Sequence, residues 1–177
     1  VVFSDKLTSI GEFAFSGCSG LKTVELPDTL TVLGNGAFNY CSALTEAVLP
    51  SGLRSIGARA FDSCSSLRTV NLNLPALTEI GDQAFYRCTS LESVHLPGSL
   101  ATIGDDVFVG CKSLKTATLD QGITTLGYRM FWQCSALESI SLPDAITVIP
   151  VNAFANCTSL THVDLPSNLT EIGQGAF

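Results

Sequence analysis

Residues 7–29 read LTSIGEFAFSGCSGLKTVELPDT, and this pattern recurs along the whole chain. Successive cysteines are separated by 23, 23, 24, 23, 23 and 23 residues, and a phenylalanine stands three residues before each. The cysteines are Cys18, Cys41, Cys64, Cys88, Cys111, Cys134 and Cys157. A register kept this closely predicts one structural unit that repeats by stacking on itself.

The repeat extends over the entire sequence. Aligned on the cysteines, the unit is L-x-x-I-G-x-x-A-F-x-x-C-x-x-L-x-x-V-x-L-P-x-x, and seven full repeats start at residues 7, 30, 53, 77, 100, 123 and 146. Residues 1–6 match the end of a unit and residues 169–177 match its beginning. We therefore expect one array over residues 1–177, as a piece of a longer array.

Two periodicities within the unit predict its local structure. The V-x-L segment alternates apolar and polar residues, as a short strand does. The segment from Ile10 to Leu21 puts Ala14, Phe15, Cys18 and Leu21 on one inward stripe, which favours a short helix or 3₁₀ turn. The expected fold is an α/β repeat solenoid, with short parallel strands on one face and short helical or 3₁₀ turns on the other.

The pattern resembles BspA-like leucine-rich repeats. The resemblance rests on I-G-x-x-A-F, as in residues 56–61, followed by C-x-x-L and V-x-L-P, and it covers the whole chain. It implies adhesion or binding of another protein or an extracellular matrix component, at the cell surface or after secretion. It implies no catalytic residue.

Composition narrows the function classes. Hydrophobic residues make up 46% of the chain and charged residues 14%, yet polar residues interrupt every apolar run, so we expect no membrane insertion. The net charge is −7, without a Lys/Arg cluster, which argues against nucleic-acid binding. No targeting signal is apparent at Val1.

The candidate reactive groups point to structural roles. One shared inward column predicts seven free, buried thiols and no metal site, because a ladder spreads its ligands along a line. His95 and His162 lie three repeats apart on outward strand positions, and His162 can pair locally with Asp164. Asp105 and Asp106 are expected to be solvated acids that favour a helix N-terminus. Asn156 and Asn168 begin glycosylation sequons. We therefore expect no enzyme and no cofactor.

The position directly after the phenylalanine of A-F-x-x-C, which we call the ladder phenylalanine, indicates a candidate partner site. A solvated slot should stay polar, but the fourth to sixth repeats place Tyr86, Val109 and Trp132 there. Arg87, Tyr128 and Arg129 lie beside them. Aromatic residues and arginine dominate protein hot spots, whereas the outward strand positions are small and polar. We expect a partner to contact these six residues, unless they only cover the edge of the core.

Two other functions remain open. The array could be a structural spacer between other domains. The outward Thr116-x-Thr118 and Ser139-x-Ser141 pairs allow a carbohydrate- or ice-binding strand face, although Asn71 and His95 interrupt that lattice. One extra residue in the third repeat, within residues 71–75, is expected to form a bulge in the turn that leaves the strand.

Overall fold

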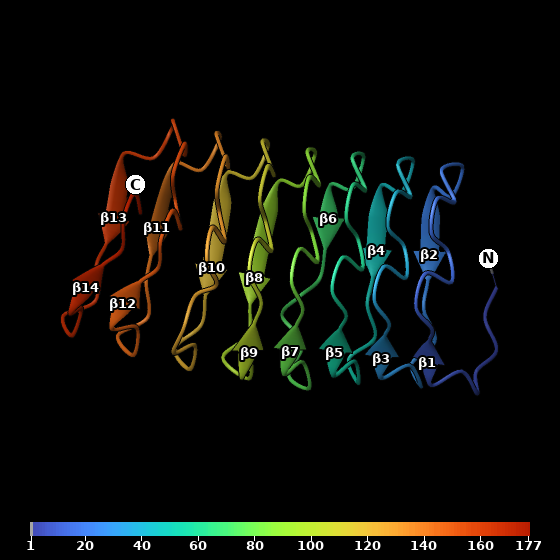
Figure 1. Cartoon of the computed structure of the whole chain (residues 1–177). Helices are drawn as coiled ribbons and strands as arrows, with labels where there is room; N and C mark the ends of the chain where they lie inside the picture. Colours follow the sequence, from blue (N-terminus) through green and yellow to red (C-terminus); the bar gives the residue numbers. More distant parts are fainter. Residues whose placement is uncertain (1) are drawn as a thin grey trace.

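The computed structural model describes residues 2–177 and shows a parallel β-solenoid of about seven turns (Figure 1). We call each repeat a coil and number coils 1–7 from the seven starting residues given above. Each strand of one coil lies beside the equivalent strand of the next coil. The predicted solenoid with short parallel strands is confirmed.

The V-x-L segments form one set of strands, which we call the strand face. Their pairs keep the register of the repeat, with Thr23 opposite Glu46 and Val94 opposite Ala117. The strands are β2 (Thr23–Glu25), β4 (Glu46–Val48), β6 (Thr69–Val70), β8 (Ser93–Leu96), β10 (Thr116–Leu119), β11 (Ser139–Ser141) and β13 (His162–Asp164).

The strand face is divided where the third repeat carries its extra residue. Strands β2, β4 and β6 form one sheet, and β8, β10, β11 and β13 form another. Strand β6 ends at Val70, and the side-chain amide of Asn71 takes over its pairing. Asn71 Oδ1 accepts from the Leu49 amide at 2.7 Å, and Asn71 Nδ2 donates to the Leu49 carbonyl at 2.9 Å. A side chain thus replaces one ladder step, and the core continues without a gap through buried Leu72, Leu74 and Leu77.

A second set of strands, which we did not predict from the sequence, ends directly before the glycine of the I-G-x-x-A-F motif in most coils. These strands are β1 (Ser9–Ile10), β3 (Val32–Leu33), β5 (Ser55–Ile56), β7 (Glu79–Ile80), β9 (Thr102–Ile103), β12 (Val148–Ile149) and β14 (Glu171–Ile172). Glycine follows because the coils approach closely there: a Cβ on Gly57 would lie 2.6 Å from the Asn35 amide nitrogen. The sheet is interrupted between β9 and β12 because residues 125–126 of coil 6 form no strand. In coil 7 Pro150 takes the place of the glycine and has no N–H to donate.

The segment opposite the strands consists of turns, so the expected helical or 3₁₀ structure is wrong. Residues 2–177 contain no helix. Alternate amides point to different acceptors: Ala60 and Asp62 donate within the coil, to Gly57 and Arg59, at 3.2 and 3.1 Å. Arg59, Phe61 and Ser63 each donate to the next coil at 2.8 Å. A helix would direct every amide back along its own segment, whereas stacking uses every second one for the neighbouring coil.

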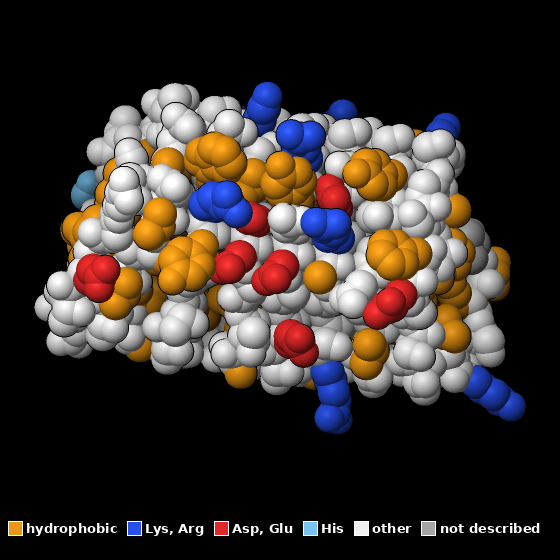
Figure 2. Space-filling model, in the orientation of Figure 1, with side chains coloured by type: hydrophobic (Ala, Val, Ile, Leu, Met, Phe, Trp, Pro, Cys, Tyr) orange, Lys and Arg blue, Asp and Glu red, His pale blue; other side chains and the backbone are white. Residues whose placement is uncertain are grey.

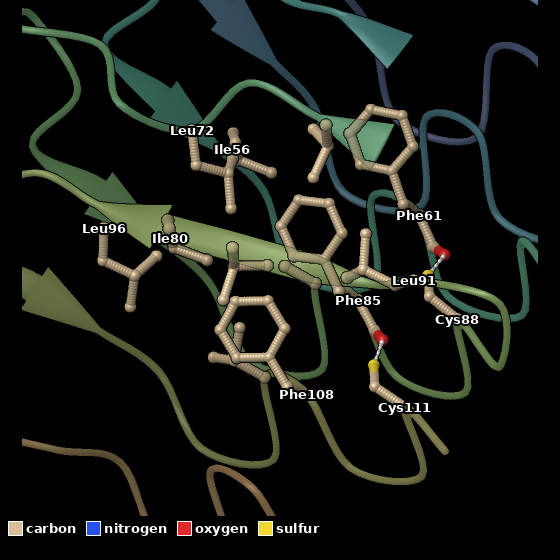
Figure 3. Packing of buried hydrophobic residues seen from close by; sticks show 14 of the residues in the cluster. Ile56, Phe61, Leu72, Ile80, Phe85, Cys88, Leu91, Leu96, Phe108 and Cys111 are labelled. Carbon is tan, nitrogen blue, oxygen red and sulfur yellow. Dashed lines mark hydrogen bonds between the residues drawn. The ribbon is translucent and has the colours of Figure 1, made fainter. Parts of the chain in front are cut away.

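Phenylalanines form the central ladder of the core. Seven successive pairs from Phe15 to Phe177 stack with ring centroids 5.1–5.5 Å apart and interplanar angles of 7–13°. Figure 3 shows Phe61, Phe85 and Phe108 in this ladder. At the N-terminal end, Phe3 meets Phe15 edge-on at 5.7 Å. Each coil therefore buries its aromatic ring only against its neighbours, which makes stacking obligatory.

The cysteines form a parallel ladder beside the phenylalanines. Each thiol from Cys41 onward donates to the carbonyl of the phenylalanine 26 or 27 residues earlier, at 3.1–3.3 Å. Two of these bonds appear in Figure 3. Residues 2–177 hold no disulfide. The prediction of buried thiols is confirmed for six cysteines and is wrong for Cys18, which is exposed in coil 1 because it has no phenylalanine ladder carbonyl of a preceding coil beside it. Burial raises the pKa of the Cys41 and Cys157 thiols to about 11, so they stay protonated at neutral pH.

Candidate functional site

The turns between the glycine and the cysteine of each coil form one side of the solenoid, which we call the turn flank. The backbone there enters the left-handed region twice per coil, two residues before and two residues after the ladder phenylalanine. Four of these positions hold glycine: Gly17, Gly36, Gly110 and Gly175. Eleven hold other residues: Phe13, Tyr40, Arg59, Ser63, Gln83, Arg87, Asp106, Arg129, Gln133, Asn152 and Asn156. Aromatic and Arg side chains at such positions are unusual, because left-handed backbone disfavours bulky residues.

The six candidate partner-binding residues all lie on the turn flank of coils 4–6. Tyr86 and Trp132 are half-buried, and Tyr128 is 56% exposed. The Arg87 guanidinium lies 5.1 Å from the Tyr86 ring centroid, and that of Arg129 lies 5.9 Å from the Trp132 ring. Each arginine is thus held beside an aromatic ring, in cation–π geometry.

Val109 is the exception among the six. It stands in the same column between Tyr86 and Trp132 but is only 2% exposed, so it adds no contact surface. The expectation of a solvated slot is wrong for this column, because Asn39 and Asp62 are also buried. Burial raises the pKa of the Asp62 carboxyl. The Ser63 hydroxyl donates to this carboxyl at 2.8 Å, and Arg59 and Arg87 lie nearby; these groups lower the pKa but offset the effect of burial only in part.

A hydrogen-bonded network crosses four coils of the turn flank. Arg129 donates twice to the buried Asp106 carboxylate, at 2.7 and 2.8 Å. Gln83 Nε2 donates to the same carboxylate at 3.3 Å, and Arg59 Nε donates to Gln83 Oε1 at 2.7 Å. Asp106 is therefore not the solvated acid expected from sequence. It fixes the Arg129 guanidinium beside Trp132, in a bidentate charge-assisted pair.

The acids before the network cap the neighbouring coil and not a helix. Asp105 Oδ1 accepts from the Tyr128 amide at 2.8 Å, and Asp82 Oδ1 accepts from the Asp105 amide at 2.9 Å. Asn35 Oδ1 does the same for the Ala58 amide. These side chains satisfy backbone donors of the following coil and hold the outer edge of the turn flank in place.

The sequence did not identify two further aromatic residues on the turn flank. Phe13 is 54% exposed and Tyr40 is 57% exposed, and both are in the left-handed conformation. Figure 2 shows hydrophobic side chains gathered in the middle of one face, with Lys/Arg and Asp/Glu side chains between them. The available signal was the unit itself, since Phe13 stands in a slot that other coils fill with small or polar residues.

The strand face has a different character. Its exposed residues are mainly Thr, Ser, Glu and Asp. His95 Nε2 lies 2.7 Å from Asp120 Oδ1, so Asp120, which replaces the usual proline, pairs with the preceding coil. His162 Nε2 lies 2.8 Å from Asp164 Oδ1, the local pair expected from sequence. Within residues 2–177, no three His, Cys, Asp or Glu side chains converge as metal ligands. The described chain also has no helix that could cross a bilayer.

Coils of parallel strands around phenylalanine and leucine ladders are those of a leucine-rich repeat protein. The family described as "BspA type Leucine rich repeat region" matches residues 1–88 and 78–177, in six copies. The chain belongs to this BspA-type leucine-rich repeat family. No curated protein sequence matches it.

Solved structures of bacterial leucine-rich repeat proteins are similar. A leucine-rich cell surface protein from Faecalibacterium prausnitzii is 25% identical, with a TM-score of 0.67, over 97% of this chain and 62% of its own. The T. pallidum leucine-rich repeat protein is 29% identical, with a TM-score of 0.67, over 94% of this chain and 67% of its own. The pneumococcal vaccine antigen PcpA is 22% identical over 96% of this chain and 45% of its own, with a TM-score of 0.67, which shows the shared fold.

Proposed function

We propose that the chain is a protein-binding, adhesion-type module of a cell-surface protein, and that it binds its partner through the turn flank of coils 4–6. The surface location rests on the similar F. prausnitzii cell surface protein. The role is binding and not catalysis.

One observation supports the choice of surface. Two of the three tyrosines, the single tryptophan and two of the five arginines lie on the turn flank of coils 4–6. These are the residue types that supply most of the energy at protein interfaces. Asp106 and the stacked rings also hold Arg129 and Arg87 in place before any partner arrives, which lowers the entropic cost of binding.

Biolayer interferometry, with solubilised extracellular-matrix proteins immobilised on the sensor, tests this function by measuring the affinity of the chain for them. We expect Trp132→Ala to weaken binding by about 2 kcal/mol, or roughly 30-fold. Because Trp132 is half-buried, its melting curve should show a stability loss of only about 1 kcal/mol. The matched control is Thr118→Ala, an exposed position on the strand face, which should leave binding within about twofold.

Two outcomes contradict the proposal. Binding that Trp132→Ala leaves unchanged but Thr118→Ala removes would move the site to the strand face. No binding to any matrix protein would favour the spacer function, in which the stacked coils set a distance between other domains.

A further inference from the structure

A hollow of about 360 Å³ opens on the turn flank of coils 1–4, away from Trp132. Its lining residues are Phe13, Asn35, Ala58, Arg59, Asp82 and Gln83. The volume is at the lower end of small-ligand sites, which span roughly 300–1,000 Å³. None of these residues belongs to the candidate partner site of coils 4–6.

The apolar wall of the hollow is an aromatic ring laid on the solenoid. A Cβ on Gly36 would lie 2.4 Å from Phe13 Cδ1 and Cε1, so only glycine allows this ring to rest on coil 2. The other side of the ring remains open, since Phe13 is 54% exposed. Phe13 also keeps a φ of 54°, a conformation for which glycine is the ordinary choice. An exposed, fixed ring is a platform for a flat apolar surface of a ligand.

The polar wall consists of three planar groups that the neighbouring coils orient. Arg59 Nε donates to Gln83 Oε1, which leaves the terminal guanidinium nitrogens free, and no ion pair within residues 2–177 involves Arg59. Asp82 uses Oδ1 for the Asp105 amide and leaves Oδ2 free. Guanidinium, carboxylate and amide together offer donors and acceptors in pairs.

The backbone around the hollow has no free strand edge. Arg59 donates to the Asp82 carbonyl, Gln83 to the Asp105 carbonyl and Gly36 to the Ala58 carbonyl, each at 2.8 Å. An extended peptide that adds a strand needs unpaired backbone groups, and here they are already used. The ligand must therefore be recognised by the ring and the planar side chains.

We propose that this hollow binds a neutral saccharide. A pyranose ring has a face of C–H groups that stacks on an aromatic ring, and a rim of adjacent hydroxyls that suits planar, two-atom hydrogen-bonding groups. Phe13 supplies the platform, and the terminal guanidinium nitrogens of Arg59 and Asp82 Oδ2 bind the hydroxyls. Gln83, whose amide already bonds to Arg59 and Asp106, orients the Arg59 guanidinium. The single positive and single negative charge of the lining cancel, which favours a neutral ligand over an acidic one.

Other hollows fit less well. One of about 310 Å³ has a similar set of side chains, including Tyr128 and Arg129, but Asp106 already occupies that guanidinium. Another, of about 380 Å³, is lined by Phe154 and Phe177 of the core ladder, and it is an end layer of the stack.

Affinity electrophoresis in native gels tests the proposal. The gels would contain one of five soluble neutral polysaccharides: hydroxyethyl cellulose, a β-1,3-glucan, a mannan, a xylan or a galactan. We expect at least one to retard the chain, and Phe13→Gly to weaken that retardation about tenfold, which corresponds to about 1.4 kcal/mol. Phe13→Gly should fold normally, because glycine already occupies the equivalent positions Gly36 and Gly175.

Tyr40→Gly is the matched control, because Tyr40 is an equally exposed left-handed aromatic on the same flank but outside the hollow. It should retain full retardation, and Arg59→Gln should lose it. Absence of retardation by all five polysaccharides, or equal loss in Phe13→Gly and Tyr40→Gly, would overturn the proposal. Trp132→Ala should not change retardation, so the result is independent of the matrix-protein experiment.

Discussion

Replacing Gly110 by alanine tests whether the turn flank consists of left-handed turns, as in the structure, or of the helix that the sequence suggested. Gly110 has a φ of 71°, two residues after the ladder phenylalanine of coil 5. There is room for the added methyl group, because its nearest neighbours would be Arg87 Cγ at 3.4 Å and Arg87 Cα at 3.9 Å. The substitution therefore changes the backbone preference with little change in packing.

The two structures predict opposite signs for this substitution. In a left-handed turn, alanine costs about 1 kcal/mol relative to glycine, because its Cβ crowds the following carbonyl. Inside a helix, the same change would stabilise the chain by about 1 kcal/mol. The difference of about 2 kcal/mol corresponds to several degrees in melting temperature for a chain of this size.

Urea denaturation at 25 °C, followed by circular dichroism, measures the effect. Gly20→Ala is the control, since Gly20 has no positive φ and no atom within 4 Å of a built Cβ, and it should change stability by less than about 0.5 kcal/mol. A Gly110→Ala variant more stable than the wild type would refute the left-handed turn.

Further predictions concern the core and the buried charges. Phe85→Ala should cost about 3–5 kcal/mol in urea denaturation, because Phe85 is fully buried between two stacked rings, and a loss below about 1 kcal/mol would exclude it from the core. A thiol reagent at pH 7 should label Cys18 alone in the native protein and all seven cysteines after non-reducing denaturation; fewer than seven would indicate a disulfide. Asp106→Asn should cost about 1–2 kcal/mol, a figure reduced because the Arg129 side chain is 46% exposed, and an unchanged melting temperature would count against the pair. Because the folded-state pKa of Asp62 is raised, its ionisation costs stability as pH rises through that pKa. The free energy of unfolding of Asp62→Asn minus that of the wild type should therefore be larger at pH 7 than at pH 3. The opposite trend would contradict the burial of this carboxyl.

The sequence alone determined the features that recur in every repeat. The Phe and Cys columns, the strand at V-x-L and the stacking of coils follow from spacing, because only one register puts these residues at equivalent positions in every coil and buries them in coils 2–7. The position of Tyr86, Arg87, Tyr128, Arg129 and Trp132 on one flank followed from the same register.

Tertiary structure decided what depends on the neighbouring coil. The spacing of inward residues from Ala14 to Leu21 fits both a helix and the observed turns. The turns form because amides such as that of Phe61 donate to the next coil. Three further features also depend on the neighbouring coil: Asp106 pairs with Arg129, the Phe13 ring lies against Gly36, and Val109 is buried. Such contacts leave no local pattern in the sequence, because each partner lies one full coil away and becomes a neighbour only when the coils stack.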